Sequence, residues 1–302
     1  MLVVPTFNPG EQWLDWLEAV ASQDISLSAV YVIDSGSTDS TVELAGEYGY
    51  ECHVIDKSDF SHGGTRQLAA QKFPDADVLV YLTQDAILAC KNSLAELVKV
   101  FEAGNVGVAY GRQLPRKNAE LIEAHARLFN YPDVSQIRAF EMKEEFGVKA
   151  AFNSNSFSAY RVTALNQVGG FPLHTIVSED MYVAAKMLKA GWSIAYCAES
   201  KVYHSHNYTI SQEFKRYFDI GVFNSRESWI MAEFGRAESE GVKFIKSEIF
   251  YLLKHNPFLV FESVIRSAVK YAGYKFGKNE KILPVSLKKL MSNHPGYWES
   301  IE

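Results

Sequence analysis

Short apolar runs alternate with amphipathic segments over about the first 110 residues of the chain. The segments between the runs carry apolar residues at helical spacing, for example Trp13, Leu14 and Leu17. Alternation of strands and helices predicts an α/β fold, with a mostly parallel sheet covered by helices on both faces. The runs are rich in β-branched and aromatic residues, as buried strands are, and lie at 2–7, 29–34, 52–56, 77–83 and 106–111.

The pattern changes in the second and third parts of the chain. Residues 111–210 begin with a polar segment, helical in pieces, that suits a lid or a substrate-facing insertion. Two separate strands are expected near the end of this part, at 191–197 and 201–206. Residues 211–302 have helical patterns in which aromatic and basic residues interleave, and they predict a helical C-terminal extension.

Composition and charge limit the possible functions. The 302 residues are 47% hydrophobic and 22% charged, which is ordinary for a soluble globular protein. The net charge of −6 and the isoelectric point of 5.8 argue against a nucleic-acid partner. The charge is divided unevenly, since residues 1–200 carry 15 basic and 25 acidic side chains and residues 201–302 carry 15 and 11. We expect the two parts to have different surroundings.

Cysteine usage and hydropathy bear on location. Cys52, Cys90 and Cys197 lie far apart without CxxC spacing, so neither a zinc site nor a disulfide framework is indicated. The N-terminal apolar run has no basic segment before it, and no run reaches the eighteen apolar residues expected of a spanning helix. These features predict a cytoplasmic protein.

Polar residues follow several predicted strands, where an open α/β sheet binds its ligands. Asp34 precedes a tight Ser-Gly-Ser turn, and Asp85 follows a buried strand, where a carboxylate can hold a divalent cation. His62, two glycines and Arg66 form a loop and helix start that suit an anionic group. Each feature alone also has a structural explanation, as a helix cap, a turn residue or a flexible turn. The chain has no GxGxxG motif, which disfavours a nicotinamide cofactor, and no GxxxxGK[ST] motif, which excludes a P-loop.

Two adjacent carboxylates, Glu179 and Asp180, stand at the expected start of a helix. Neighbouring residues on a helix point about 100° apart, so the two cannot face one partner in the same way. One of them is a candidate for chemistry. The alternative is that both only complement the helix dipole, worth about 0.3–1 kcal/mol.

Taken in order, the segments VVPTFN, VIDSGSTDST, YLTQDA, GGF and SED resemble a family 2 inverting glycosyltransferase of the GT-A fold, whose sheet is Rossmann-like. DFSHGGTRQ, TQDA and VYHSHNYT resemble the rhamnosyltransferase branch of that family. The resemblance covers roughly residues 1–210. It implies a catalytic domain with a nucleotide-binding half at 1–110 and an acceptor-binding half at 111–210, followed by the helical region.

The resemblance also implies roles for single residues on the nucleotide side. Pro5, Thr6 and Asp34 match positions that hold the nucleobase and ribose, with Ser35 where many relatives have a second Asp. Arg66 and Gln84 are expected on the same nucleotide.

Asp85 matches the last Asp of the DxD motif, whose metal, Mg²⁺ or Mn²⁺, binds the diphosphate. The first Asp of the motif is Thr83 here, which leaves one carboxylate instead of two. His204 or His206 is therefore the candidate to complete the metal shell, because a strand would place both on one face. In this family the Asp of the ED pair is the general base. Asp180 is thus the expected catalytic residue, and Glu179 is expected to orient the acceptor or the helix start.

The C-terminal region suggests a surface for a partner. From Arg266 to Lys289 there are seven basic residues and one acidic residue, interleaved with Tyr271, Tyr274 and Phe276. Such a mixture suits the surface of an anionic membrane, and equally a helical subdomain packed on the core or on a second subunit. The resemblance favours the membrane.

The expected activity is therefore inverting transfer of L-rhamnose from dTDP-rhamnose to a hydroxyl of a lipid-linked or cell-surface polysaccharide. The resemblance implies a polyprenyl-linked acceptor and a place at the inner face of the cell membrane. Transfer from a UDP-hexose or a UDP-N-acetylhexosamine remains an alternative. A nucleotidyltransferase and a non-catalytic nucleotide-sugar binding protein are the alternatives from other classes.

Overall fold

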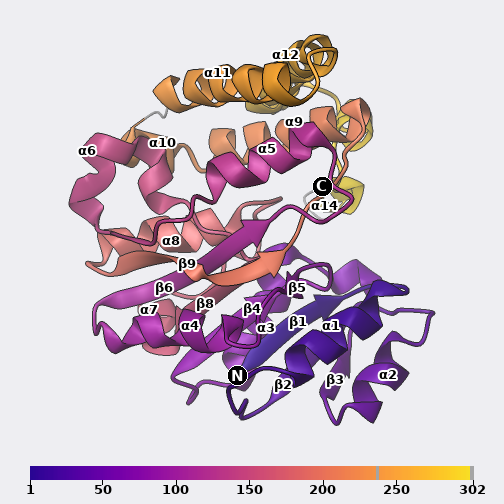
Figure 1. Cartoon of the computed structure of the whole chain (residues 1–302), viewed down its shortest axis with the longest axis vertical. Coiled ribbons are helices and arrows are strands. Elements are labelled where there is room, and N and C mark those ends of the chain that lie inside the picture. The colour runs from indigo at the N-terminus through magenta and orange to yellow at the C-terminus, as the bar shows by residue number, and fades with distance from the viewer. Residues whose placement is uncertain (236–237, 300–302) are drawn as a thin grey trace.

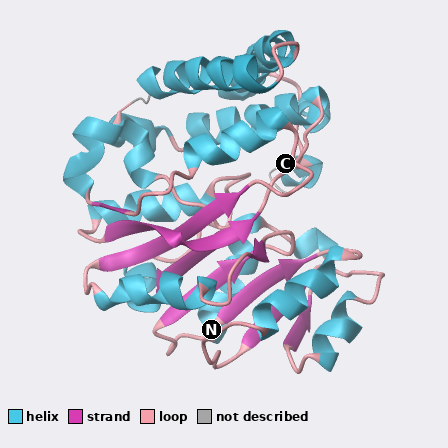
Figure 2. Ribbon diagram, viewed as in Figure 1, coloured by secondary structure: helices cyan, strands magenta, loops and turns pink. Residues whose placement is uncertain are grey.

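The computed structural model describes residues 1–235 and 238–299 as a sheet with helices on both faces and a further helical layer (Figure 1, Figure 2). The strands are β1 Leu2–Thr6, β2 Val30–Asp34, β3 Glu51–Val54, β4 Val78–Leu82, β5 Ile87–Leu88, β6 Val106–Leu114, β7 Gln136–Arg138, β8 Phe157–Arg161 and β9 Ser193–Tyr203. The helices up to residue 210 are α1 Gln12–Ala21, α2 Thr41–Glu47, α3 His62–Lys72, α4 Ser93–Lys99, α5 Leu121–Asn130, α6 Lys143–Phe146, α7 Val162–Gln167 and α8 Glu179–Lys189. The later helices are α9 Ile210–Arg226, α10 Ser228–Phe234, α11 Glu238–His255, α12 Leu259–Lys278, α13 Val285–Met291 and α14 Pro295–Glu299.

The sheet has the strand order β3-β2-β1-β4-β8-β6-β9-β5, and β7 pairs with β9. Strands β3, β2, β1 and β4 are parallel, as predicted for the first part of the chain. Strand β8 runs antiparallel to both β4 and β6, and β6 is parallel to β9. The prediction of two strands at 191–206 is wrong, because β9 is continuous from Ser193 to Tyr203. No glycine or proline interrupts it, and a shift in its register with β6 at Gly111/Arg112 absorbs the irregularity.

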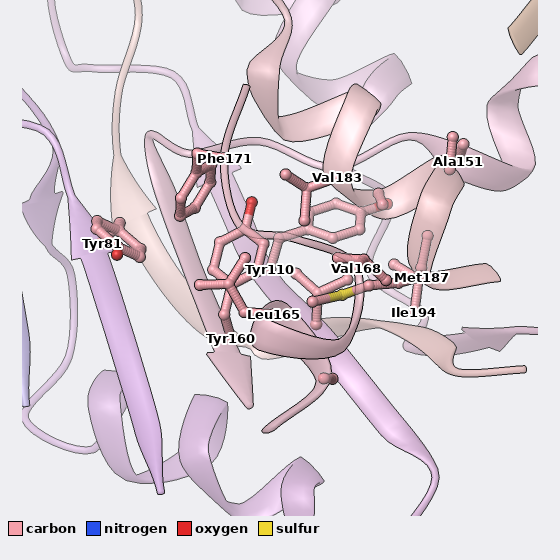
Figure 3. Close-up of a cluster of buried hydrophobic side chains, with 14 of the residues drawn as sticks. Tyr81, Tyr110, Ala151, Tyr160, Leu165, Val168, Phe171, Val183, Met187 and Ile194 are labelled. Atoms are coloured by element: carbon pink, nitrogen blue, oxygen red, sulfur yellow. The ribbon is translucent and has the colours of Figure 1, made fainter. Parts of the chain in front are cut away.

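Buried side chains cover both faces of the sheet, which confirms the predicted layers. On one face Trp13 and Trp16 of α1 stack at a centroid distance of 4.7 Å. Trp16 rather than Leu14 completes the buried stripe of α1, and Leu14 is 45% exposed. On the other face Tyr160 packs edge-on against Tyr81 of β4 and against Phe171 in the loop before α8, as Figure 3 shows.

The C-terminal helices form a separate layer over the half of the sheet that contains β6 and β9 (Figure 1). Helix α12 lies along α9, and α11 packs on α5 and α12. Glycines let α9 and α12 approach closely, since a Cβ at Gly221 would lie 2.3 Å from Tyr274 O and a Cβ at Gly277 would lie 2.0 Å from Phe218 O. Over residues 1–235 and 238–299, no helix combines the length and the apolar character needed to cross a membrane.

Replacing Gly277 by Ala should destabilise the chain by about 1–3 kcal/mol, because the added methyl group meets the backbone of α9 and forces the two helices apart. Thermal denaturation measures the effect. Gly241→Ala in α11 is the matched control. A Cβ there has no atom within 4 Å, so the better helix propensity of alanine should leave stability equal or higher. Equal melting temperatures for Gly277→Ala and the wild type would contradict the close packing of α9 on α12.

Candidate active site

Hydrogen bonds join the loops that follow β1, β2 and β4. The amide of Gln84 pairs with the backbone of Phe7, accepting from its N–H at 2.7 Å and donating to its carbonyl at 3.1 Å. Asn8, in the left-handed region at φ 43°, donates its N–H to Ser37 Oγ at 2.8 Å and accepts at its side-chain oxygen from the N–H of Thr38. Gln84 therefore helps to fix the conformation of the loops that are expected to bind the nucleotide. Direct contact between Gln84 and a nucleotide stays a prediction.

Asp34 is completely buried at the end of β2. Its carboxylate accepts hydrogen bonds from Thr6 Oγ1 (2.8 Å), Gly36 N (3.0 Å), Ser37 N (2.7 Å) and Ser37 Oγ (2.6 Å). These four bonds occupy the acceptor capacity of a carboxylate, so in this structure Asp34 holds the loop together. Contacts of Asp34 with a base or ribose stay a prediction, as do those of Pro5, Thr6 and Ser35.

Two glycines, one in the first turn of α3 and one in the GGF loop, let segments of the chain pack closely on each other. A Cβ at Gly63 would lie 1.8 Å from Pro172 O, and one at Gly170 would lie 2.2 Å from Gln67 Oε1. Glycine is thus required where the start of α3 meets the GGF loop, which leads to α8. This close approach of two chain segments accounts for Gly63, for which the sequence suggested the approach of a ligand.

Asp85, His204 and His206 form one cluster, and it is the group found among the described residues that could hold a metal ion. His204 Nε2 lies 3.3 Å and His206 Nε2 lies 3.2 Å from Asp85 Oδ2, and the two nitrogens are 3.0 Å apart. Both histidines were expected on a strand, but they lie in the loop that begins where β9 ends. The structure places both histidines beside Asp85, and metal binding by them stays a prediction.

The spacing of the three donor atoms fits one ion. Metal–ligand bonds of about 2.1 Å that meet at right angles place their donor atoms about 3.0 Å apart, as observed here. Burial lowers the pKa of His204, and it lowers that of His206 to about 4, although the Asp85 carboxylate opposes the change. Both imidazoles are then neutral near pH 7 and offer the lone pairs that a metal ligand needs.

The two carboxylates at the start of α8 have different surroundings. Glu179 is 5% exposed, lies 3.1 Å from Arg66 Nη1 and accepts from Asn155 Nδ2 at 2.8 Å. Burial by itself would raise the pKa of Glu179, but Arg66, His62 and the hydrogen bond from Asn155 together outweigh it and hold the pKa below its usual value. Arg66 is 4% exposed and also donates to the His62 carbonyl at 2.8 Å. In this structure the charge of Arg66 is matched by Glu179 in the interior, and contact of Arg66 with the nucleotide stays a prediction.

Asp180 is the less tightly bound of the pair. It accepts hydrogen bonds from the N–H groups of Asn155 (3.1 Å) and Met181 (2.7 Å). Burial, and then the negative charge of Glu179, raise its pKa to about 7. A carboxylate with such a pKa is suited to take a proton near neutral pH. The preceding residue, Ser178, has the left-handed φ of 61°, a strained conformation for serine that is found mostly at functional sites.

Two site residues were not found by sequence reasoning. Asn155 touches both Glu179 and Asp180, and Gln113 touches His204. Asn155 stands just before β8, so the polar run NSNS ahead of an apolar strand was a signal that could have shown it. Gln113 lies inside a strand, and no feature of the sequence distinguishes it.

The fold and the site define a class of protein, and comparison with known proteins agrees. Residues 1–219 match the model of the family described as glycosyltransferase-like family 2. The chain belongs to this family and is a glycosyltransferase. Its GT-A-like α/β sheet with C-terminal helices confirms the expected fold.

Two curated relatives match over the whole chain. The O-antigen chain rhamnosyltransferase RfbN of Salmonella typhimurium is 46% identical over 302 residues, which are 100% of this chain and 96% of the relative. The O-antigen chain rhamnosyltransferase WbaN of Salmonella anatum is 45% identical over the same length and covers the same shares.

Solved structures show the same fold at low sequence identity. The mannosyltransferase PcManGT from Pyrobaculum calidifontis, in complex with GDP-Man and Mn²⁺, has a TM-score of 0.56 at 16% identity and covers 99% of this chain and 84% of its own. S. aureus TarS 1-349 in complex with UDP has a TM-score of 0.53 at 14% identity, over 93% of this chain and 90% of its own.

His206→Ala should weaken Mn²⁺ binding by about 100-fold or more, because it removes one of three ligand atoms. The measurement is the rise in melting temperature as Mn²⁺ is titrated, since an ion that binds only the folded state stabilises it. His53→Ala, on β3 at the far edge of the sheet, is the control and should respond to Mn²⁺ as the wild type does. An unchanged titration for His206→Ala would remove His206 from the metal site.

Proposed function

We propose that this chain transfers L-rhamnose, with inversion, from dTDP-rhamnose to a hydroxyl of a lipid-linked polysaccharide acceptor. The observation that carries the proposal is the match to two O-antigen chain rhamnosyltransferases at 46% and 45% identity over the entire chain. The site agrees with it, because the family chemistry needs a base and a cation site, and the structure has candidates for both. The choice of dTDP-rhamnose over a UDP-sugar rests on the relatives alone.

In the proposed reaction Asp180 is the general base. It takes the proton of the acceptor hydroxyl while the hydroxyl oxygen forms a bond to the anomeric carbon of the sugar. The bond from that carbon to the diphosphate oxygen breaks on the opposite face, and the nucleoside diphosphate leaves. The ion pair with Arg66 keeps Glu179 ionised, and its negative charge beside Asp180 makes the Asp180 carboxylate a stronger base.

Asp85, His204 and His206 are proposed to hold the divalent cation of the reaction. A cation bound there would neutralise the charge of the departing diphosphate. Two imidazoles and one carboxylate favour Mn²⁺ over Mg²⁺, because Mg²⁺ prefers oxygen ligands. The replacement of the first Asp of the DxD motif by Thr83 is thereby compensated by nitrogen ligands.

Asp180→Asn should lower kcat by at least about 100-fold, because the amide keeps the size of the carboxylate but cannot take a proton. Transfer is measured as release of dTDP from dTDP-rhamnose with acceptor glycolipid. The variant should fold at least as stably as the wild type above pH 7, since burial and Glu179 disfavour the ionised Asp180 carboxylate.

Glu179→Gln is the comparison for that experiment. It leaves the Arg66 cation buried without its partner, so the melting temperature should fall, in contrast to Asp180→Asn. The wild-type rate should also decrease about tenfold per pH unit well below pH 7, where Asp180 is protonated. Near-normal turnover by Asp180→Asn would refute its role as the base.

We also propose that the outer face of α11 and α12 binds an anionic membrane. Helix α12 turns its buried side toward α9, and α11 turns its buried side toward α5, so their exposed sides face away from the body of the protein (Figure 1). In the turn between them Phe258 is 93% exposed. Further exposed apolar residues of α11 and α12 are Val242, Phe250, Leu253, Phe261, Val264, Ile265 and Tyr271.

The charges on this face are complementary to an anionic surface. Among the described residues, Lys246, Lys254, Lys275 and Lys278 form no ion pair, and all four are exposed. Each lysine near such a surface contributes about 1 kcal/mol. Exposed apolar side chains beside lysines are typical of helices that lie in a membrane interface.

The double variant Phe258→Ser/Phe261→Ser should bind vesicles of phosphatidylglycerol at least about tenfold more weakly than the wild type in sedimentation, because two apolar anchors are lost. Leu14→Ser/Leu68→Ser, at exposed leucines of α1 and α3, is the matched control and should bind normally. Phosphatidylcholine vesicles should bind little of either protein. If the wild type is instead a dimer in light scattering that Phe258→Ser/Phe261→Ser dissociates, a second copy covers this face and the membrane proposal fails.

A further inference from the structure

We propose that Gln113 is a positioning residue that joins the metal ligands to the catalytic carboxylate; this inference rests on the proposed function. Gln113 is the second-last residue of β6 and is 1% exposed. Its side chain lies between His204, which follows β9, and Ser154, which precedes β8. It reaches neither the metal-binding atoms nor Asp180 itself, so it acts through other residues.

The contacts of Gln113 determine which way its amide points. Arg127 Nη1, which can only donate, lies 2.7 Å from one atom of the amide, and this atom must be the oxygen. The same oxygen lies 2.8 Å from His204 Nδ1. The amide nitrogen donates to Ser154 Oγ at 2.9 Å. Every polar atom of this buried side chain therefore has a partner that fits its chemistry.

This orientation sets the tautomer of His204. Because the oxygen of Gln113 can only accept, His204 Nδ1 must carry a proton. In the neutral imidazole the lone pair is then on Nε2, the atom that faces Asp85 and His206. A hydrogen bond from the second nitrogen commonly orients a metal-binding histidine and raises its ligand strength. Gln113 thus prepares His204 as a ligand.

The other end of Gln113 leads to the base. Ser154, which accepts its hydrogen bond, is followed directly by Asn155. The N–H of Asn155 donates to Asp180 Oδ2, and its side chain donates to Glu179. The buried amide of Gln113 thereby connects His204, a proposed metal ligand, with the Ser154–Asn155 segment, which contacts the proposed base Asp180. A displacement of Gln113 would disturb both sides of the reaction.

Gln113→Met is the test variant, because it keeps the length of the side chain and removes its hydrogen bonds. The dissociation constant of Mn²⁺, measured by paramagnetic resonance without substrate and again with dTDP, should rise about 10- to 100-fold. Gln113→Glu still offers oxygens to His204 and Arg127, so its Mn²⁺ affinity should stay near that of the wild type or exceed it. This rescue is an outcome that a purely structural role of Gln113 does not produce.

Ser154→Ala tests the link from Gln113 to the proposed base separately from its link to His204. It should leave the Mn²⁺ dissociation constant unchanged and lower kcat by about three- to tenfold at saturating Mn²⁺. Asn105→Ala is the control, since Asn105 bonds Ser193 at the opposite end of the same pair of strands, β6 and β9. It should alter neither quantity.

Two results would overturn the proposal. One is wild-type Mn²⁺ affinity in a folded Gln113→Met protein. The other is an equal loss of affinity in Gln113→Met and Gln113→Glu, which would mean that packing rather than the hydrogen bond to His204 matters. Mn²⁺ binding needs no turnover, so these results are independent of whether dTDP-rhamnose is the donor. Should Gln113→Met fail to fold, the comparison of Gln113→Glu with the wild type still decides, because a weaker Mn²⁺ site in Gln113→Glu contradicts the role.

Discussion

The site depends on the reversal of strand direction at β8. The C-terminal ends of β4, β6 and β9 lie at the same end of the sheet. The N-terminal end of β8 lies there too, because β8 runs antiparallel to its neighbours β4 and β6. The residues that follow β4 and β9 and those that precede β8 therefore meet, although about 120 residues of sequence separate Asp85 from His204. If β8 ran parallel to β4, Asn155 would lie at the opposite end of the strands, far from Asp85.

The site also depends on how the buried charges are paired. Two adjacent carboxylates in the interior repel each other, and only one is matched by a cation, in the pair of Glu179 with Arg66. Asp180 has no such partner, and burial together with the charge of Glu179 raises its pKa to about 7. In the proposed mechanism Glu179 stays paired with Arg66, and its charge makes Asp180 the stronger base.

The helical layer is attached to the site and is not an independent appendage. Arg266 of α12 donates to the carbonyl of Tyr208 at 2.8 Å and pairs with Glu213 of α9 at 3.1 Å. Tyr208 in turn packs against His206, at a centroid distance of 5.1 Å. If α11 and α12 rest on a membrane as proposed, these contacts hold the loop of His204 and His206 at a defined height above the lipid.

The sequence alone determined the α/β class, the parallel first half of the sheet and the order of the motifs, because apolar periodicity and turn residues act locally. Its resemblance to family 2 glycosyltransferases also pointed to Asp85, His204, His206 and Asp180 as candidate site residues. Only the tertiary structure decided that Asp34 is enclosed by its own loop, that Arg66 serves Glu179, and that β9 is one strand. It alone revealed Gln113, whose role comes from contacts with residues 14 to 91 positions away. Long-range pairing of polar groups in the interior leaves no periodic trace along the chain, and for that physical reason the sequence could not show it.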